Sequence, residues 1–147
     1  MEIILAFIGI AIMTGGTFFA STLGVTICGN AGVGTMKKNS DAFGSYLTLS
    51  ALPSSQGLYG FVGYFMMSGF LTEEITALQA WAIFWLGIMM AAVGFYSAIR
   101  QAQVCANGIK SIGEGHDVFT ATLVLAVFPE LYAILSLLVT ILISFAI

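Results

Sequence analysis

Four long apolar runs dominate this sequence and restrict the folds open to it. Clusters of charged residues separate the runs, which cover residues 3–29, 42–69, 80–107 and 118–147. A helix that crosses a hydrocarbon core of ~30 Å needs about 20 apolar residues, so each run is long enough to span a membrane. The runs therefore predict an all-α membrane protein with four transmembrane helices.

The composition excludes several classes of protein. Only 7% of the 147 residues are charged and 59% are hydrophobic, whereas about a quarter of the residues in a soluble domain are charged. A soluble enzyme, a disordered chain and a nucleic-acid binder are therefore excluded, the last because four basic residues cannot form a basic patch. The sequence also lacks a Gly-x-x-x-x-Gly-Lys-Ser/Thr loop, and we expect neither nucleotide nor haem as a cofactor.

The loop charges predict the orientation of the chain. Lysines occur in the loops predicted at 30–41 and 108–117, whereas the middle loop carries Glu73 and Glu74 and no basic residue. By the positive-inside rule the two lysine-bearing loops face the cytoplasm and both termini lie outside. The first run lacks a basic start and is longer than a signal core, so we interpret it as a span rather than a cleavable signal peptide.

The sequence also looks duplicated. Ile-Cys-Gly-Asn at 27–30 and Val-Cys-Ala-Asn at 104–107 are predicted to end the first and third helices, while Gln56 and Glu130 stand near the middle of the second and fourth. The chain is therefore predicted to contain two tandem helical hairpins, residues 1–72 and 73–147. Because each repeat has two spans, the repeats have the same orientation.

The first and third predicted helices share a stripe of small residues at intervals of four. Such stripes allow close approach of helix backbones in lipid. They are consistent either with ordinary pairing in a bundle or with the crowded inner layer of an oligomeric ring, with the bulkier second and fourth helices outside. We interpret the two cysteines as buried small hydrophobes. The stripes contain Gly16, Ala20, Gly24, Cys28 and Gly32, and Gly94, Ala98, Ala102 and Ala106.

One carboxylate lies where a bilayer should exclude it. Asp117 is predicted to cap the fourth helix, as Asp41 caps the second, and Glu130 follows Asp117 by 13 residues, or about 20 Å. An acidic group at that depth costs at least ~2.5 kcal/mol and marks an ion path in most cases. Arg100 is predicted about two turns before a loop, where it either snorkels to the headgroups or contacts that ion path.

Candidate oxygen ligands occur at a similar depth. A hard cation such as sodium needs several oxygens around one carboxylate, whereas a proton carrier needs only the carboxyl group and an apolar pocket. The glutamines therefore favour sodium over protons. Pro53 and Pro129 each leave a helix carbonyl without its usual partner, which either kinks the helix or supplies a further ligand. The candidate oxygens belong to Ser55, Gln56, Tyr59, Gln101 and Tyr132.

The segment Ala-Leu-Pro-Ser-Ser-Gln-Gly-Leu-Tyr-Gly-Phe at 51–61 resembles the second helix of V-type ATPase proteolipids, above all the four-helix subunit K of bacterial sodium-pumping enzymes. Gln101, and Glu130 followed by Tyr-Ala-Ile-Leu at 132–135, resemble the second hairpin of that subunit. The resemblance implies a homo-oligomeric rotor ring in a bacterial plasma membrane, driven by ATP hydrolysis on other subunits. Its partners would be a stator subunit with an arginine, central-stalk subunits and the lipid bilayer.

The resemblance also assigns the residues of a sodium site. The ligands would be Glu130, Gln101, Gln56, Ser55 and the backbone carbonyl of Leu52, and Tyr59 would close the site by a hydrogen bond to the glutamate. Arg100, next to Gln101, departs from the family pattern, and a cation there could lower sodium affinity. The same rotor carrying protons, a small ion-coupled antiporter and a passive pore or scaffold remain the alternatives.

Overall fold

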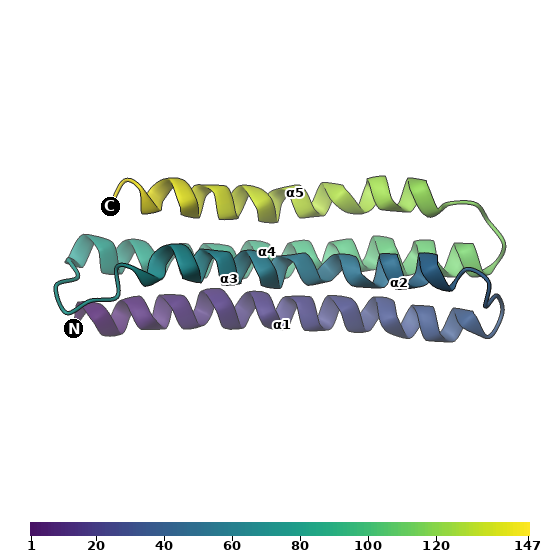
Figure 1. Ribbon diagram of the computed structural model, residues 1–147, viewed down its shortest axis with the longest axis horizontal. Helices are drawn as coiled ribbons and strands as arrows, with labels where there is room; N and C mark the ends of the chain where they lie inside the picture. The colour runs from purple at the N-terminus through teal and green to yellow at the C-terminus, as the bar shows by residue number, and fades with distance from the viewer.

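The computed structural model describes residues 1–147 as a bundle of long, nearly antiparallel helices (Figure 1). The chain is helical throughout, as the sequence predicts, and its two termini lie at the same end of the bundle (Figure 1). The elements are α1 (Glu2–Met36), α2 (Phe43–Ala51), the 3₁₀ turn η1 (Leu52–Ser54), α3 (Ser55–Ser68), α4 (Ala77–Gly113) and α5 (Phe119–Ser144).

Three of these helices, α1, α4 and α5, are long and apolar enough to cross a membrane. The predicted second span is helical from Phe43 to Ser68, but η1 divides it into α2 and α3, neither of which is long enough alone. Pro53 explains the division, because proline has no N–H to donate and its ring crowds the preceding turn. Pro129, in contrast, leaves α5 continuous.

The first and third helices are longer than the sequence predicts. The predicted ends are Asn30 and Asn107, but α1 continues to Met36 and α4 to Gly113. The loops therefore shrink from 30–41 and 108–117 to 37–42 and 114–118. Apolar packing continues beyond both asparagines, and no proline interrupts either helix, so the helical backbone persists up to the charged residues.

The predicted aspartate caps are also wrong. The residues that precede α2 and α5 are Ala42 and Val118, and no capping side chain accepts a hydrogen bond from the first N–H groups of either helix. Only α4 begins with a capping box, in which Thr76 and Gln79 bond each other's backbone N–H. The chain leaves α4 through Gly115, whose φ of 92° is a left-handed conformation that suits glycine.

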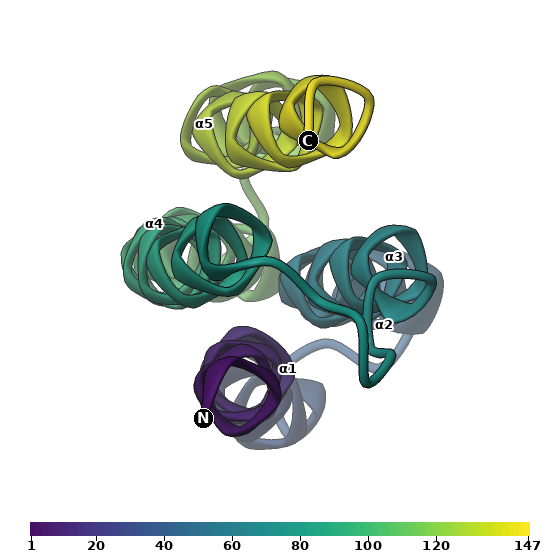
Figure 2. The same cartoon turned by 90° about the vertical axis from the view of Figure 1, so that its left-hand side faces the viewer.

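The small-residue stripes bring α1 and α4 into close contact. Figure 2 shows α4 between α1 and α5, with α2 and α3 to one side. A Cβ placed on Gly16 would lie 2.6 Å from the Cβ of Ala91, and one on Gly24 would lie 3.3 Å from the Ala98 carbonyl oxygen. Within one chain the stripes therefore pair α1 with α4.

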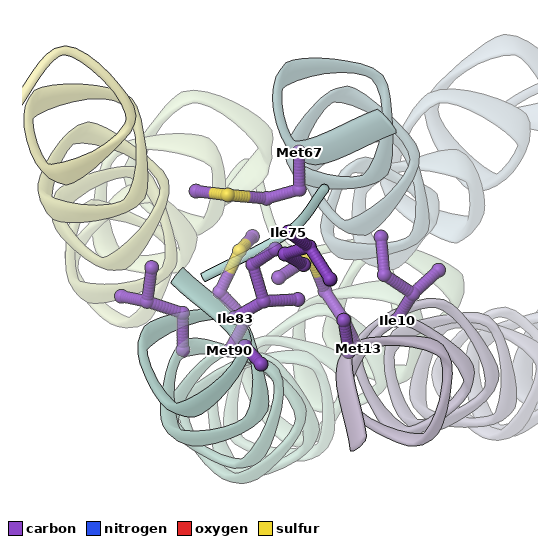
Figure 3. Packing of buried hydrophobic residues seen from close by; sticks show 9 residues of the cluster. Ile10, Met13, Met67, Ile75, Ile83 and Met90 are labelled. Atoms are coloured by element: carbon purple, nitrogen blue, oxygen red, sulfur yellow. The ribbon is translucent and has the colours of Figure 1, made fainter. Parts of the chain in front are cut away.

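Two apolar clusters form the core, one toward each end of the bundle. Figure 3 shows the first, in which Met13, Ile83 and Met90 of α1 and α4 meet Met67 of α3. The second surrounds Tyr46 near the opposite end of the bundle. Along α4 the first cluster ends at Met90 and the second begins at Ala102, so a layer of buried polar side chains separates them. This layer contains Gln56, Ser97 and Gln101.

Candidate ion site

Glu130 lies near the middle of α5, with its carboxylate turned toward α3 and α4. Tyr59 of α3 donates a hydrogen bond to Oε1 over 2.6 Å, and Gln101 of α4 donates one to Oε2 over 2.8 Å. The only salt bridge in the chain joins the N-terminal amine to Glu2, so no protein cation lies within 4 Å of this carboxylate. The bonds from Tyr59 and Gln101 are the only hydrogen bonds to the Glu130 carboxyl oxygens.

The two glutamines connect Glu130 to the interior of the bundle. Both are fully buried. The Gln56 amide nitrogen donates to Gln101 Oε1 over 3.0 Å and to Ser97 Oγ over 3.1 Å. The Gln101 amide nitrogen donates to the Ala126 carbonyl over 3.1 Å as well as to Glu130. Every N–H of both carboxamides is therefore satisfied, as buried amides require.

The 3₁₀ turn places Ser55 and the Leu52 carbonyl beside Gln56. Ser55 Oγ lies 3.1 Å from the Leu52 carbonyl oxygen and 3.3 Å from Gln56 Oε1, within reach of a hydrogen bond to either. Helix α1 packs against the side of the turn opposite the site. Pro53 is buried there, and a Cβ placed on Gly24 would lie 2.5 Å from the Pro53 Cβ. A glycine at 24 therefore lets α1 approach the proline that shapes this end of the site.

The structure thus brings all six predicted site residues together. Hydrogen bonds connect Gln56 through Gln101 and Glu130 to Tyr59. The Ser55 hydroxyl extends this network by one bond at a time, to Gln56 Oε1 or to the Leu52 carbonyl. Tyr132, a further candidate oxygen donor in the sequence, is not part of it, since its side chain is 68% exposed and has no hydrogen bond. Cys28 and Cys105 are buried free thiols, and the Cys28 thiol donates a hydrogen bond to the Ala102 carbonyl rather than to this network. The six residues of the network are Leu52, Ser55, Gln56, Tyr59, Gln101 and Glu130.

Sequence reasoning missed Ser97. Its hydroxyl accepts from Gln56 and donates to the Pro129 carbonyl over 2.8 Å, so that it links α3, α4 and α5. Ser97 lies one helical turn before Gln101, a spacing that puts both side chains on one face of α4. A similar spacing relates the Ala126 carbonyl to Glu130. A search for hydroxyls one turn from each predicted ligand would have found Ser97.

Arg100 lies farther from the loop than predicted and does not touch this network. Because α4 continues to Gly113, 13 residues, or about 20 Å, separate Arg100 from the end of the helix. Its guanidinium donates to Tyr96 Oη over 2.9 Å and to Gln103 Oε1 over 3.0 Å, and it lies 4.8 Å from the centroid of the Tyr96 ring. The side chain turns to the surface of α4 instead of toward Glu130.

The groups around Glu130 are suited to a hard cation or a proton. A lone carboxylate is surrounded by amide, hydroxyl and carbonyl oxygens, which are hard ligands suited to alkali and alkaline-earth ions. No group of three or more histidine, cysteine or carboxylate side chains exists that could hold a transition metal. A partly buried carboxylate such as Glu130, without a protein counter-charge, is stabilised by a bound proton or cation.

Comparison with known proteins supports the same interpretation. The family model for the ATP synthase C-subunit matches the chain in two copies, at residues 8–67 and 84–143. A-type ATP synthase subunit K of Methanocaldococcus jannaschii is 32% identical over 140 residues, which cover 95% of this chain and 61% of that protein. V-type sodium ATPase subunit K of Enterococcus hirae is 31% identical over 120 residues, which cover 82% of this chain and 77% of that protein.

This chain thus spans about three fifths of the length of the archaeal relative. The two copies of the family model together cover most of its residues, and the second copy includes both Gln101 and Glu130. The resemblance seen first in a short segment of the sequence extends over almost the whole chain. The protein belongs to the ATP synthase C-subunit family.

Proposed function

We propose that this chain is a rotor-ring subunit of a rotary V- or A-type ATPase and that it carries sodium ions across the membrane on Glu130. One observation carries the proposal: the half-buried Glu130 carboxylate has no protein counter-cation and is held by donors from α3 and α4. A group that is costly to leave charged is suited to bind, carry and release a small cation. The names of both relatives point to subunits of such complexes.

The family and the three long apolar helices make this chain an integral membrane protein. We infer four spans in two hairpins, residues 1–72 and 73–147, with α2, η1 and α3 together as the second span. The helical run from Phe43 to Ser68 is about 39 Å long, enough to cross the hydrocarbon core despite its 3₁₀ turn. Lysines in and near the loops 37–42 and 114–118 favour a cytoplasmic position for both loops and an outside position for both termini.

The oxygen inventory favours sodium over a proton. A proton needs only the carboxyl group of Glu130, but this site adds the side-chain oxygens of Gln56, Gln101 and Ser55 and the Leu52 carbonyl. Five oxygens from three helical segments are a suitable ligand set for a hard cation. A relative that is a sodium ATPase subunit supports this choice.

In this proposal the ion neutralises Glu130, and the neutral site turns past lipid at low cost. Tyr59, which bonds Oε1 from α3, closes the site. At the stator, a positively charged side chain of the partner subunit would replace the ion as the partner of the carboxylate. The ring would be turned through central-stalk subunits by ATP hydrolysis on other subunits.

Carbodiimide labelling tests the ion. Purified rings are treated with dicyclohexylcarbodiimide at fixed pH and ionic strength, with sodium chloride replaced stepwise by choline chloride, and labelled Glu130 is quantified by mass spectrometry. Sodium should slow the labelling in a saturable manner, because the bound ion occupies the carboxylate. The Glu130→Gln variant, which should not react, controls for labelling elsewhere.

The alternatives give different results. Labelling that changes with pH but at no sodium concentration would overturn the sodium assignment and favour the same rotor carrying protons. Ion transport by the assembled complex should be lost in Glu130→Gln, whereas transport that survives this substitution would favour a passive pore or scaffold. A purified particle of only two copies instead of a closed ring would favour a small antiporter.

A further inference from the structure

An open groove lies between α4 and α5. Its volume is about 680 Å³, and all of its lining residues come from these two helices. The lining is largely apolar but includes Arg100, which lies at the depth of the ion site because its neighbour Gln101 bonds Glu130. The other principal lining residues are Ala92, Tyr96, Phe128 and Tyr132.

The internal repeat shows what covers the corresponding surface of the first hairpin. The two copies of the family model are offset by 76 residues at both ends, so that Ala92 corresponds to Gly16 and Arg100 to Gly24. In the first hairpin neither position is open. α4 covers both, with Ala91 against Gly16 and the Ala98 carbonyl against Gly24. A single chain has no element that covers the equivalent groove of the second hairpin.

The same offset identifies the missing element. The counterpart of α4 is α1, and the counterparts of Ala91 and Ala98 are Gly15 and Thr22. Both lie on the exposed face of α1, and a Cβ placed on Gly15 would have no neighbour within 4 Å. Exposed residues lie along this face of α1, each three or four residues, or about one helical turn, from the next. They are Ile4, Ile8, Ala11, Gly15, Phe18, Thr22 and Thr26.

Arg100 favours a protein rather than lipid in this groove. An arginine at the centre of a bilayer costs about 2.5–3.5 kcal/mol unless polar groups or water reach it. Its partners within the chain are Tyr96 and Gln103 alone. The contact of Gly24 with Ala98 puts residues 22–26 of α1 level with Arg100. Copies related by rotation about a ring axis keep that level, so Thr22 and Thr26 of a second copy stand opposite Arg100.

The two threonine hydroxyls can accept hydrogen bonds there. Each donates its own proton to a carbonyl of α1, Thr22 to Phe18 over 2.9 Å and Thr26 to Thr22 over 2.7 Å. Their oxygen lone pairs remain available, and a guanidinium has five N–H donors. We propose that α1 of a second copy packs into the α4–α5 groove and that Arg100 donates hydrogen bonds to Thr22 and Thr26 of that copy. This pairing rests on the ring of the proposed function and specifies how neighbouring copies meet.

Cysteine cross-linking tests the pairing in membranes that contain the full chain. The counterparts of the Gly16–Ala91 contact are Ala92 and Gly15, so G15C/A92C should give a ladder of disulfide-linked oligomers after oxidation with copper phenanthroline. G15C mixed with tagged A92C should stop at dimers. G15C/L138C is the matched control, because Leu138 is exposed on α5 but does not line the groove. The unmodified chain controls for the buried Cys28 and Cys105.

Native mass spectrometry of the same samples separates the two proposals. Intact rings without a G15C/A92C ladder, or an equal ladder from G15C/L138C, would overturn the pairing alone and leave the rotor in place. Lipid in the groove would give this result. Absence of any oligomer would overturn the rotor proposal and, with it, the pairing.

A double-mutant cycle tests the contact of Arg100. In rings that contain Arg100, replacing Thr22 and Thr26 with valine should raise the dissociation constant of the interface about threefold to twentyfold. This range corresponds to the energies measured for single interhelical hydrogen bonds in membranes. The same T22V/T26V change should have no effect in an R100M background. The readout is the detergent-induced dissociation of purified rings. Equal effects of T22V/T26V in both backgrounds would overturn the assigned contact.

Discussion

Replacing Ser97 with alanine should weaken sodium binding although Ser97 is not a predicted ligand. The Ser97 hydroxyl is 4% exposed and makes two interhelical hydrogen bonds, one from Gln56 and one to the Pro129 carbonyl. The first of these fixes the Gln56 carboxamide with Nε2 toward α4 and Oε1 toward Ser55. Without the hydroxyl the Gln56 Nε2 keeps only its bond to Gln101, so the carboxamide and its ligand oxygen are held less firmly.

The two hydrogen bonds of Ser97 determine the expected loss of sodium affinity. A neutral buried hydrogen bond contributes about 1 kcal/mol, so the loss of one or both bonds costs about 1–2 kcal/mol. If that energy is lost from the ion-bound state, the sodium concentration that half-protects Glu130 rises about fivefold to thirtyfold. Labelling in the absence of sodium should be unchanged, because Tyr59 and Gln101 still bond the carboxylate.

The measurement is a sodium titration of carbodiimide labelling on purified rings of wild type and Ser97→Ala. Ser136→Ala is the matched control, since Ser136 is a buried serine whose only hydrogen bond, 2.7 Å to Ala133, stays within α5. That control should shift the half-protecting concentration little. Equal shifts in both variants, or none in Ser97→Ala, would refute the positioning role of Ser97.

Two further substitutions test the closing bond and the helix packing. Tyr59→Phe removes the 2.6 Å bond to Glu130, and since a hydrogen bond to a charged group contributes about 1.5–3 kcal/mol, radioactive sodium should leave the ring at least about tenfold faster. An unchanged release rate would exclude a closing role. Gly60→Ala places a Cβ 2.7 Å from that of the fully buried Thr17, so thermal unfolding should show a loss of about 1–3 kcal/mol. Gly69→Ala, with no neighbour within 4 Å, should unfold like the wild type, and equal stabilities of the two alanine variants would contradict the packing.

Hydropathy and the depth of one carboxylate were enough to predict the helical fold and most of the polar residues near Glu130. The Leu52 carbonyl and the closing bond of Tyr59 came only from the family resemblance. The helix ends were not predictable in the same way. Asn30 and Asn107 look like the end of a span, but a helix does not stop where lipid stops. In this chain packing against the neighbouring helix carries α1 and α4 several residues further.

The hydrogen bonds that support the predicted ligands were harder to predict than the ligands themselves. Serine in an apolar helix usually bonds the carbonyl of its own preceding turn, as Ser136 does. Its position one turn before Gln101 makes Ser97 a candidate, but the sequence does not show that its hydroxyl bonds two other helices instead of its own. Only the crossing of α3, α4 and α5 shows the difference. The groove behind Arg100 was unpredictable for a similar reason, since it depends on which helix faces are left uncovered.

The unequal lengths of the helices have a mechanical consequence. With 37 residues α4 is about 55 Å long and with 35 residues α1 is about 52 Å long, whereas α5 has 26 residues and is about 39 Å long. The hydrocarbon core accounts for only ~30 Å, and α4 extends past α5 at both ends of the bundle (Figure 1). The paired α1 and α4 helices are therefore longer than a hydrocarbon core, and they continue without interruption to the two loops at 37–42 and 114–118. A force applied to the loop ends of α1 and α4 is transmitted to the polar layer of Gln101 through α4, because this helix is continuous from Gln101 to Gly113.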